Sequence, residues 1–533
     1  MDEREKITDT DRKDKASYHI TVVGREREAQ IECGENESIL EALVRQGIYV
    51  SAACGGRGTC GKCKLMLLYG ELAITSFDRA KISEKELKEG YRLSCKALPV
   101  SDCTIKLVSG SEEDFEVVTE HQNSSTEKAD RKEDCAIAID IGTTTIAVSL
   151  IDLKNGSVLW TYSTVNKQRA YGADVIARIQ ASNAGKKEAL RESIRKDLLE
   201  GIQCVIKKTG TIKDKIKKIA IAGNTTMGHL LMGYSCETLG VYPFTPVNIA
   251  ETILPFEEVL GSDYLKAPVV LLPGISTYVG GDISAGLLSC DFDQKEKPCL
   301  LIDLGTNGEM AIGNKDRIIV TSTAAGPAFE GGNISSGVGS IAGAICNLDI
   351  VENKPVFKTI GESAPIGICG TGVIETVSEL VRTKLVDETG LLVDEYFEEG
   401  YLLAEDSEGT PITFTQRDVR EIQLAKAAVR AGIELLIKRY EINYEDIDTV
   451  YLAGGFGYKM NISKAINTGL LPGELESKIK AIGNSSLGGA IRYLMDQTAQ
   501  DRMEYIISIS TEISLSNDKD FNDLYVDYMY FEI

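Results

Sequence analysis

The chain is short of positive charge and of long apolar runs. Its 533 residues include 58 lysines and arginines against 80 aspartates and glutamates, so its net charge is −22. Such an acidic protein has little with which to neutralise a phosphate backbone, which argues against nucleic acid as a partner. No run of 18 apolar residues occurs, so no membrane span is predicted, and the charged start MDEREKITDTDRKDK lacks the apolar core of a signal peptide. We therefore expect a cytoplasmic protein.

Thirteen cysteines are present, and in a cytoplasmic protein clustered cysteines more often bind metal than form disulfides. Four of them have the spacing C-x5-C-x2-C with a distant fourth: Cys54, Cys60, Cys63 and Cys95. Four thiolates can hold two iron ions bridged by sulfide, and the glycines of SAACGGRGTCGKC (51–63) allow the sharp turns that three ligands on one loop need. The alternatives are unliganded thiols and a structural zinc site, although zinc sites usually have two C-x2-C pairs and only one is present.

The segment around these cysteines predicts a compact, β-rich module over residues 17–110. YHITVVG, AQIEC, KLMLLYG and CTIKLVSG favour strands, and GENESILEALVRQG favours a helix with Ser38 and Glu41 as a capping box. The polar residues 1–16 predict a disordered tail. The acidic residues 111–133 predict a flexible linker.

From residue 134 onward, buried-type strands alternate with helical patterns, which predicts an α/β protein of about 400 residues. AIDIGTTTIAVSL (138–150) and LIDLGTNGEMAIG (301–313) share one form: an apolar strand, an aspartate, a Gly-Thr turn and a second strand. This echo predicts two similar subdomains, 134–295 and 296–533, that face a shared cleft.

Each copy of this motif can bind phosphate. A glycine lets the backbone come close, and neighbouring amides, hydroxyls and side-chain amides donate to phosphate oxygens, while an aspartate holds Mg²⁺ directly or through water. The candidates in the first copy are Asp140, Gly142, Thr143, Thr144 and Thr145. Those in the second copy are Asp303, Gly305, Thr306, Asn307 and Gly308. The chain lacks the GxxxxGK[ST] loop, so this is a different kind of nucleotide site.

Further candidates lie between and beyond the two copies. The glycines of VYLAGGFG (450–457) let a nucleoside lie flat on the backbone, and AAGPAFEGGNISSG (324–337) carries a glutamate among glycines. The residues concerned are Gly326, Glu330, Gly331, Gly454 and Gly455.

Three assignments have two interpretations each. Asn224 in AGNTT either reaches phosphate or forms an Asx turn, and Asp282 in GGDI either orients water or Mg²⁺ or caps a helix. The GICGTG glycines, Gly370 among them, either line the cleft or only turn the chain.

DIGTTT, DLGTNGE and LAGGFG resemble the phosphate and adenosine motifs of the ASKHA superfamily of sugar and acetate kinases, heat-shock chaperone ATPases and actin. A ferredoxin module followed by such an ATPase resembles the reductive activators of corrinoid proteins, the RACo-like family. The resemblance runs from about residue 18 to 533. Further segments also fit that family: NKQRAYGADVIARI (166–179), AIAGNTTMGHLL (220–231), YVGGDISAG (278–286), GICGTGVIE (367–375), REIQLAKAAVRAGIELL (420–436) and EISLSNDKDFNDLYVDYMYF (512–531).

This resemblance implies a multidomain α/β protein: a β-grasp-like 2Fe-2S ferredoxin of α+β type, followed by a two-subdomain, actin-like ATPase. It implies ATP-driven reduction of Co(II) to Co(I) on the corrinoid protein of a methyltransferase system. The cofactors would be a 2Fe-2S cluster, ATP and Mg²⁺, with Asp140 and Asp303 in catalysis. An upstream electron donor and a homodimer are also implied. Gln423 and Lys426 lie three residues apart and therefore share one face of a helix. The resemblance implies that this face contacts the nucleotide, and the alternative is that it is exposed to solvent.

Two departures limit the resemblance. Some archaeal activators carry a C-terminal cysteine-rich 4Fe-4S module, whereas the last four cysteines here are widely dispersed, and the linker is short for the extra domain of some relatives. The alternative functions are an activator of another low-potential enzyme, such as a radical dehydratase, and a redox-responsive ATPase switch. A small-metabolite kinase is disfavoured, because phosphoryl transfer needs no electron.

Overall fold

A computed structural model describes residues 17–24, 28–46, 48, 50, 52, 54–107 and 133–531. It divides into two compact units: residues up to 113 together with 169–173, and the remainder of the chain. The predicted tail 1–16 and nearly all of the predicted linker 111–133 lie outside the described residues. In the part of the chain that is described, no helix is long and apolar enough to cross a membrane.

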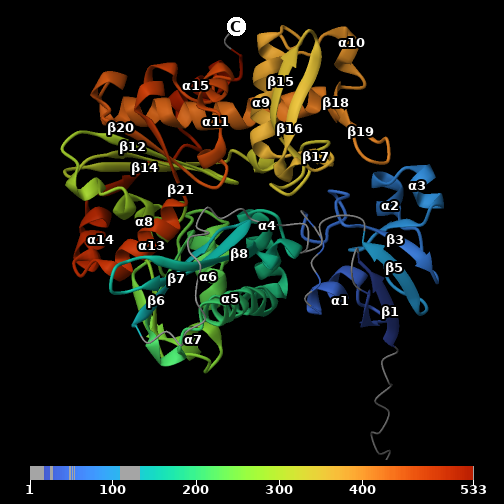
Figure 1. The fold of residues 1–533 in the computed structure, drawn as a ribbon, viewed down its shortest axis with the longest axis horizontal. Helices are drawn as coiled ribbons and strands as arrows, with labels where there is room; N and C mark the ends of the chain where they lie inside the picture. The colour runs from blue at the N-terminus through green and yellow to red at the C-terminus, as the bar shows by residue number, and fades with distance from the viewer. Residues whose placement is uncertain are drawn as a thin grey trace, which may run out of the picture. The chain divides into compact units, whose positions relative to one another are not determined.

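The first unit is a five-stranded sheet in the order β2-β1-β5-β3-β4, with β1 parallel to β5 and antiparallel to β2 (Figure 1). Its elements are β1 (Ser17–Val23), β2 (Glu28–Gly34), α1 (Ile39–Arg45), β3 (Lys64–Tyr69), α2 (Ser76–Lys81), α3 (Glu84–Lys88), β4 (Tyr91–Leu93) and β5 (Cys103–Leu107). The predicted strands and helix are confirmed, and Ser38 and Glu41 form the predicted capping box. Alternate strand residues such as Ile20, Leu65 and Ile105 are fully buried, so the sheet and α1 enclose one core.

The second unit contains two six-stranded sheets built on one plan. The first sheet has the order β10-β11-β9-β6-β7-β8 and the second β21-β20-β12-β13-β14-β22 (Figure 1). The strands of the first are β6 (Cys135–Ile141), β7 (Thr145–Asp152), β8 (Val158–Val165), β9 (Ile216–Gly223), β10 (Thr252–Pro255) and β11 (Pro268–Leu271). Those of the second are β12 (Cys299–Leu304), β13 (Gly308–Gly313), β14 (Ile318–Thr323), β20 (Thr449–Ala453), β21 (Ile479–Gly483) and β22 (Ser510–Glu512).

The two sheets confirm the repeat seen in the sequence. In each, an antiparallel hairpin lies beside a parallel strand that comes later in the chain: β6 and β7 beside β9, and β12 and β13 beside β20. Asp140 is opposite Ala222 of β9, and Asp303 is opposite Ala453 of β20. The two aspartates therefore occupy equivalent positions in the two halves.

Helices cover both sheets, and one core is shared between the halves. The helices are α4 (Val175–Ala181), α5 (Lys187–Thr209), α6 (Thr225–Met232), α7 (Phe256–Leu260), α8 (Gly281–Ser289), α11 (Gln416–Tyr440), α12 (Ile462–Asn467), α13 (Ser485–Met495), α14 (Ala499–Ser508) and α15 (Lys519–Asp527). Helix α13 packs on α8, β6 and β9, and its Leu487 shares a buried cluster with Ala220 and Leu301. A boundary at residue 295 thus separates the strands of the two sheets but not their core.

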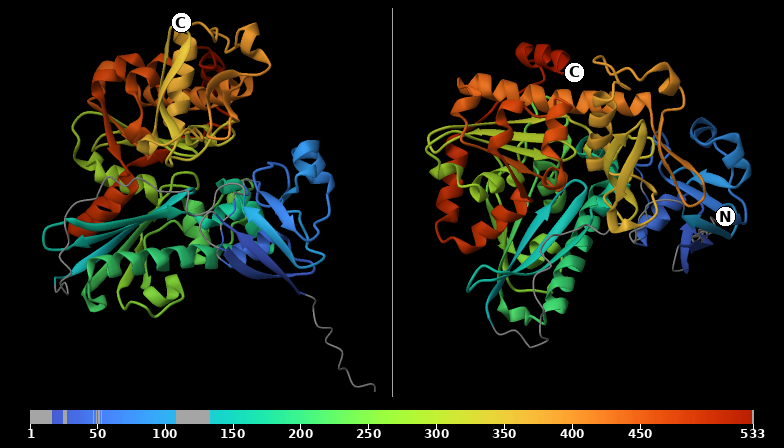
Figure 2. Two further views of the ribbon diagram at one scale, coloured as in Figure 1. Left: turned by 45° about the vertical axis from the view of Figure 1, so that its right-hand side comes forward. Right: turned by 45° about the horizontal axis from the view of Figure 1, so that its top comes forward.

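The second half carries an added layer. It consists of β15 (Ala344–Val351), β16 (Lys354–Thr359), β17 (Gly367–Ile368), α9 (Gly370–Arg382), α10 (Asp394–Phe397), β18 (Tyr401–Glu405) and β19 (Pro411–Phe414). The long helix α11, orange in Figure 2, lies against β13 and β14 and carries α15 on another side. Apolar side chains of α9, α11 and β15 belong to one large buried cluster, so this layer is integral to the second half.

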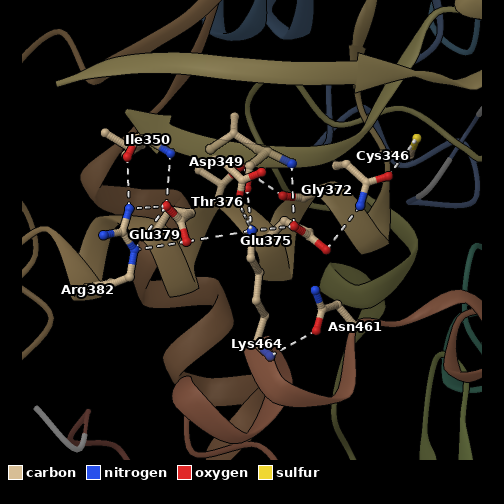
Figure 3. Close-up of polar contacts among 12 residues, drawn as sticks. Cys346, Asp349, Ile350, Gly372, Glu375, Thr376, Glu379, Arg382, Asn461 and Lys464 are labelled. Carbon is tan, nitrogen blue, oxygen red and sulfur yellow. Dashed lines mark hydrogen bonds and ion pairs between the residues drawn. The ribbon is translucent and has the colours of Figure 1, made fainter. Parts of the chain in front are cut away.

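A buried ion cluster ties α12 to α9 and β15 (Figure 3). The ammonium of Lys464 lies 2.6 Å from Glu375 Oε2 and 2.7 Å from Asp349 Oδ1, and it also donates to the carbonyl of Leu348. Glu375 and Glu379 are almost fully buried, and Glu379 also binds Arg382. Burial alone would raise the pKa of Glu379, but hydrogen bonds from Arg382 and from the Ile350 amide lower it overall.

Lys464 Nζ also lies 3.6 Å from Glu379 Oε1. Lys464→Met is therefore expected to destabilise the second unit by about 3–5 kcal/mol, because two buried carboxylates, Glu375 and Glu379, lose a cationic partner. Urea unfolding followed by circular dichroism measures this loss. Lys459→Met is the matched control: it removes an exposed lysine five residues earlier and should change stability by no more than about 0.5 kcal/mol. Equal unfolding midpoints for the two variants would contradict the importance of the cluster.

Candidate functional site

The two predicted aspartates meet at the start of one distant helix. Asp140 accepts hydrogen bonds from Asn484 Nδ2 and Ser486 Oγ, each at 2.7 Å, and Ser485 Oγ lies 3.4 Å from Asp303 Oδ2. Asn484 is also the N-cap of α13, where its Oδ1 accepts from the Leu487 amide. Three consecutive residues therefore contact both halves of the repeat. None of the motifs identified in the sequence includes these three residues, although Asn-Ser-Ser before an apolar helix is a recognisable capping signal.

Four carboxylates act on one another here: Asp140, Asp282, Asp303 and Glu309. Burial, together with the charges of the neighbouring carboxylates, raises the pKa of both Asp282 and Asp303 to about 7 and the pKa of Glu309 well above its usual range. Burial also raises the pKa of Asp140, against hydrogen bonds from Ser486 and Asn484. Asp282 lies in the first turn of α8, whose N-cap is Gly280, so it is not the helix cap. When ionised, these neighbouring carboxylates repel one another, and a bound cation would stabilise them.

Mg²⁺ is a suitable cation for this group of carboxylates. Among the described residues, no three acidic, histidine or cysteine side chains are arranged to hold an ion directly. Mg²⁺ does not need that, because it keeps several waters and is usually bound by one or two carboxylates plus substrate phosphates. Asp140 and Asp303, at the ends of equivalent strands, are the two candidates.

The increase in Tm on adding MgATP is expected to be larger at pH 8 than at pH 6. Acidic groups with a folded pKa near 7 bind more protons when folded than when unfolded between about pH 4 and pH 7, so their ionisation lowers stability as pH rises through that window. Above pH 7 the ionised carboxylates repel one another, and the bound cation relieves this repulsion. Thermal unfolding at both pH values, with Asp282→Asn as the comparison, measures the effect. A pH-independent increase would contradict it.

Glu330 joins the two phosphate hairpins. Its Oε2 accepts from the Thr144 hydroxyl at 2.8 Å and its Oε1 from the Thr306 hydroxyl at 3.2 Å, and the two hydroxyls are 3.5 Å apart. Glu330 ends the short 3-10 helix Pro327–Glu330. The structure therefore brings together one predicted residue from each of three separate motifs.

The rest of the first hairpin is held tightly. Gly142 and Thr145 close the turn through a hydrogen bond of 2.9 Å from the Gly142 amide to the Thr145 carbonyl. Thr143 Oγ1 accepts from Asn224 Nδ2 at 3.0 Å, while Asn224 Oδ1 caps α6 by accepting from Met227 N. Asn224 thus makes the local cap and also reaches the phosphate hairpin.

Glycine at 454 is required by the structure. Gly454 has φ +91°, and a Cβ there would lie 2.4 Å from the Leu304 carbonyl oxygen and 2.9 Å from Asp303 Oδ1. A Cβ on Gly326 or Gly455 would instead meet nothing within 4 Å, and one on Gly305 only the Asn307 carbonyl oxygen at 3.8 Å. These three glycines therefore border space that a ligand can approach.

The other predicted glycines serve packing. A Cβ on Gly370 would lie 1.8 Å from the Phe329 carbonyl oxygen, and one on Gly331 would lie 2.4 Å from that of Val338. A Cβ on Gly308 would lie 2.8 Å from Thr323 Oγ1. For Gly370, the structure therefore favours turning and close packing of the chain over lining a cleft.

The side-chain amide of Asn307 donates to the Glu309 carboxylate at 3.2 Å, so this predicted residue contacts the group of four carboxylates.

Gln423 and Lys426 are placed differently from both interpretations. They share a face of α11 as predicted, but both are fully buried, which excludes the solvated face. Lys426 Nζ donates to the carbonyls of Tyr528 and Tyr530 at 2.7 Å, and Gln423 donates to that of Met529. Buried polar groups need hydrogen-bond partners, and the backbone carbonyls of the C-terminal segment are the acceptors for these two side chains. The structure therefore joins Gln423 and Lys426 to the C-terminal segment rather than to the phosphate hairpins.

The four cysteines predicted to hold a cluster form two pairs. The sulfurs of Cys63 and Cys95 are 3.2 Å apart, and the hydrogen bond between the two thiols lowers the pKa of Cys63 to about 7 while it raises the pKa of Cys95. The hydrogen bond between Cys60 and Cys54 likewise lowers the pKa of Cys54 to about 3 and raises the pKa of Cys60. All four are free thiols. Two pairs match a cluster in which each of two irons takes two thiolates, and thiolates rather than thiols are the ligands.

The loop also has the backbone that such a cluster needs. Gly55, Gly56, Gly58 and Gly61 all have positive φ, between 62° and 81°. Turns of this kind let successive amides point toward the sulfurs. The residues present therefore fit a 2Fe-2S cluster.

Family models match the whole of this arrangement. A 2Fe-2S iron-sulfur cluster binding domain matches residues 21–100, the RACo middle region matches 135–295, and the C-terminal domain of RACo, the ASKHA domain, matches 297–533. The chain thus has a ferredoxin domain followed by an ASKHA domain, as predicted.

Curated proteins and solved structures agree with the family models. The corrinoid activation enzyme RamQ of Eubacterium limosum is 34% identical over 418 residues, which is 73% of this chain and 69% of RamQ. The Co(II) methylated amine-specific corrinoid protein reductase of Methanosarcina barkeri is 29% identical over 429 residues, 73% of this chain and 76% of that protein. A solved reductive activator for corrinoid, iron-sulfur protein aligns with a TM-score of 0.69 and 29% identity over 96% of this chain and 98% of that one. The chain belongs to the RACo-like family of corrinoid reductive activators.

Proposed function

We propose that this protein passes one electron to the Co(II) corrinoid of a methyltransferase corrinoid protein, restoring Co(I), and that ATP drives the transfer. The observation that carries the proposal is the presence in one chain of the paired cysteines and of the two phosphate hairpins joined through Glu330. The names of RamQ and of the Methanosarcina reductase support the same activity. A kinase would have no use for the ferredoxin domain.

ATP is needed for an energetic reason. Plant-type 2Fe-2S centres have reduction potentials near −400 mV, and Co(I) is the stronger reductant. Moving one electron uphill by about 100 mV costs roughly 2.3 kcal/mol. Binding or hydrolysis of ATP that favours one of two conformations can supply a cost of this size.

Each group of residues has a role in this proposal. Cys54, Cys60, Cys63 and Cys95 hold the cluster, which supplies single electrons when bound. Asp140 and Asp303 hold Mg²⁺ and orient water at the phosphates. Donors to phosphate are Thr143, Thr144, Thr145, Asn224, Thr306 and Asn307. Gly142, Gly305, Gly326, Gly454 and Gly455 shape the site around ATP, and Gly308 and Gly331 allow the close packing behind it.

The proposal includes three statements about the cell. An upstream electron donor reduces the ferredoxin unit, the activator works as a homodimer, and it acts in the cytoplasm. The corrinoid protein is the partner that receives the electron, and neither nucleic acid nor a membrane is involved, in keeping with the net charge of −22.

The test mixes the chemically reduced protein, MgATP and candidate Co(II) corrinoid proteins under anaerobic conditions and follows the Co(I) absorption band. We expect Co(I) to form only when ATP is present. A non-hydrolysable ATP analogue, compared with ATP, separates the effect of binding from that of hydrolysis. Absence of ATP-dependent Co(I) with every corrinoid partner would overturn the proposal, and zinc in place of iron and sulfide would remove electron transfer from it.

A further inference from the structure

The segment NKQRAYGADVIARI (166–179) has no role in the function proposed so far. Two of its polar side chains, Asn166 and Arg178, are fully buried. Burying a guanidinium is costly unless its donors are satisfied, so their partners indicate what the segment does.

Those partners are consecutive carbonyls of the first phosphate hairpin. Asn166 Nδ2 donates to the Gly142 carbonyl at 2.9 Å, and the backbone amide of Asn166 donates to the Thr144 carbonyl at 2.9 Å. Arg178 donates through its guanidinium to the carbonyl between them, that of Thr143. Three successive carbonyls are thus held by two residues.

This arrangement sets the direction of the hairpin amides. In a trans peptide the C=O and N–H point in opposite directions, so holding the carbonyls of residues 142–144 aims the amides of residues 143–145 away from the segment 166–179. It also turns the negative ends of three peptide dipoles away from where an anion would bind, and it places a fixed positive charge behind the hairpin. The Thr144 hydroxyl, on the same turn, already contacts Glu330 and lies beside Thr306.

The two residues are themselves held in place. Gln168 Oε1 lies 3.4 Å from Arg178 Nη1, and the backbone N–H of Gln168 donates to Asn166 Oδ1 at 3.0 Å. Met227 Sδ contacts both Asn166 and Arg178 from α6, the helix capped by Asn224. The support is therefore a connected network rather than two isolated bonds, and it extends to α6, whose N-cap Asn224 also contacts the hairpin through Thr143.

We propose that Asn166 and Arg178 are positioning residues for the nucleotide phosphates, acting through the carbonyls of the hairpin 142–144. The inference rests on the proposed ATP site. It predicts that their loss weakens recognition of phosphate more than recognition of the nucleoside, because only the hairpin depends on them.

The test uses the cluster-loaded, full-length protein and the variants Arg178→Lys and Asn166→Ala. Binding of MgATP and of adenosine is measured by calorimetry or by ligand-observed NMR. We expect MgATP affinity to fall at least about tenfold in each variant, with adenosine affinity unchanged, since each variant leaves a buried hairpin carbonyl without its hydrogen-bond donor and tenfold corresponds to the loss of about one such bond. The double variant should lose less than the product of the two single effects, because both act on one hairpin.

Arg420→Lys, the same substitution at an exposed arginine, is the matched control and should leave both affinities unchanged. Folding is checked by the melting temperature and by the visible spectrum of the cluster, and Asn166→Ser replaces any variant that does not fold. Unchanged MgATP affinity in folded variants, or equal losses for MgATP and adenosine, would overturn the inference while leaving the proposed function in place. Failure of the unmodified protein to bind MgATP would instead overturn both.

Discussion

Cys95→Ser is expected to abolish ATP-dependent formation of Co(I) while MgATP still binds. Cys95 lies 3.2 Å from Cys63 and completes the second thiol pair, and a serine hydroxyl is a far poorer ligand for iron than a thiolate. Without that ligand the cluster is lost or unstable, so no centre remains to carry the electron. Iron and sulfide content, the visible spectrum and the rate of Co(I) formation measure the change, and we expect the rate to fall more than about a hundredfold.

Cys204→Ser is the matched control. Cys204 is a partly exposed residue of α5, in the second unit, and belongs to neither thiol pair. That variant should retain its cluster and its activity. If Cys95→Ser kept full iron and sulfide and still produced Co(I) at the original rate, the cysteines would be wrongly assigned.

Features carried by local spacing could be predicted from the sequence. The cysteine loop, the capping box at Ser38 and the two Asp-x-Gly-Thr hairpins are each encoded within about a dozen residues, and the structure places all of them as expected. The repeat could be predicted for the same reason, since both copies carry one pattern. Two short helices, α2 and α3, were missed although each begins with a capping box, because their apolar pattern is weak.

Features carried by distant partners could not be predicted. Asn484 and Ser486 bind Asp140 from more than 340 positions away, and no local pattern records that contact. The face of α11 that holds Gln423 and Lys426 was identified correctly, but its partner was not, since the C-terminal segment reaches it from about 100 positions away. Spacing determines which side chains share a face, whereas the topology determines what that face meets.

Asp303→Asn is expected to lower ATP hydrolysis at least about a hundredfold and to leave the cluster intact. The substitution keeps the shape of the side chain at the end of β12 but removes the charge proposed to hold Mg²⁺ and orient water. Because burial and the charges of Asp282 and Asp140 raise the pKa of Asp303 to about 7, ionised Asp303 lowers the stability of the folded protein above that pH. The nucleotide-free variant should therefore be more stable than the unmodified protein at pH 8, and equally stable below about pH 3, where the carboxyl is protonated in both the folded and the unfolded state.

Loss of activity combined with a gain in stability distinguishes this role from simple damage to the fold. Phosphate release, Co(I) formation and the melting temperature at the two pH values measure it. Asp316→Asn, at an exposed aspartate between β13 and β14, is the matched control and should change none of them. Unchanged ATP turnover in Asp303→Asn would refute the assigned role, and a lower melting temperature at pH 8 would show that Asp303 stabilises the folded site instead of being held there against the repulsion of its neighbours.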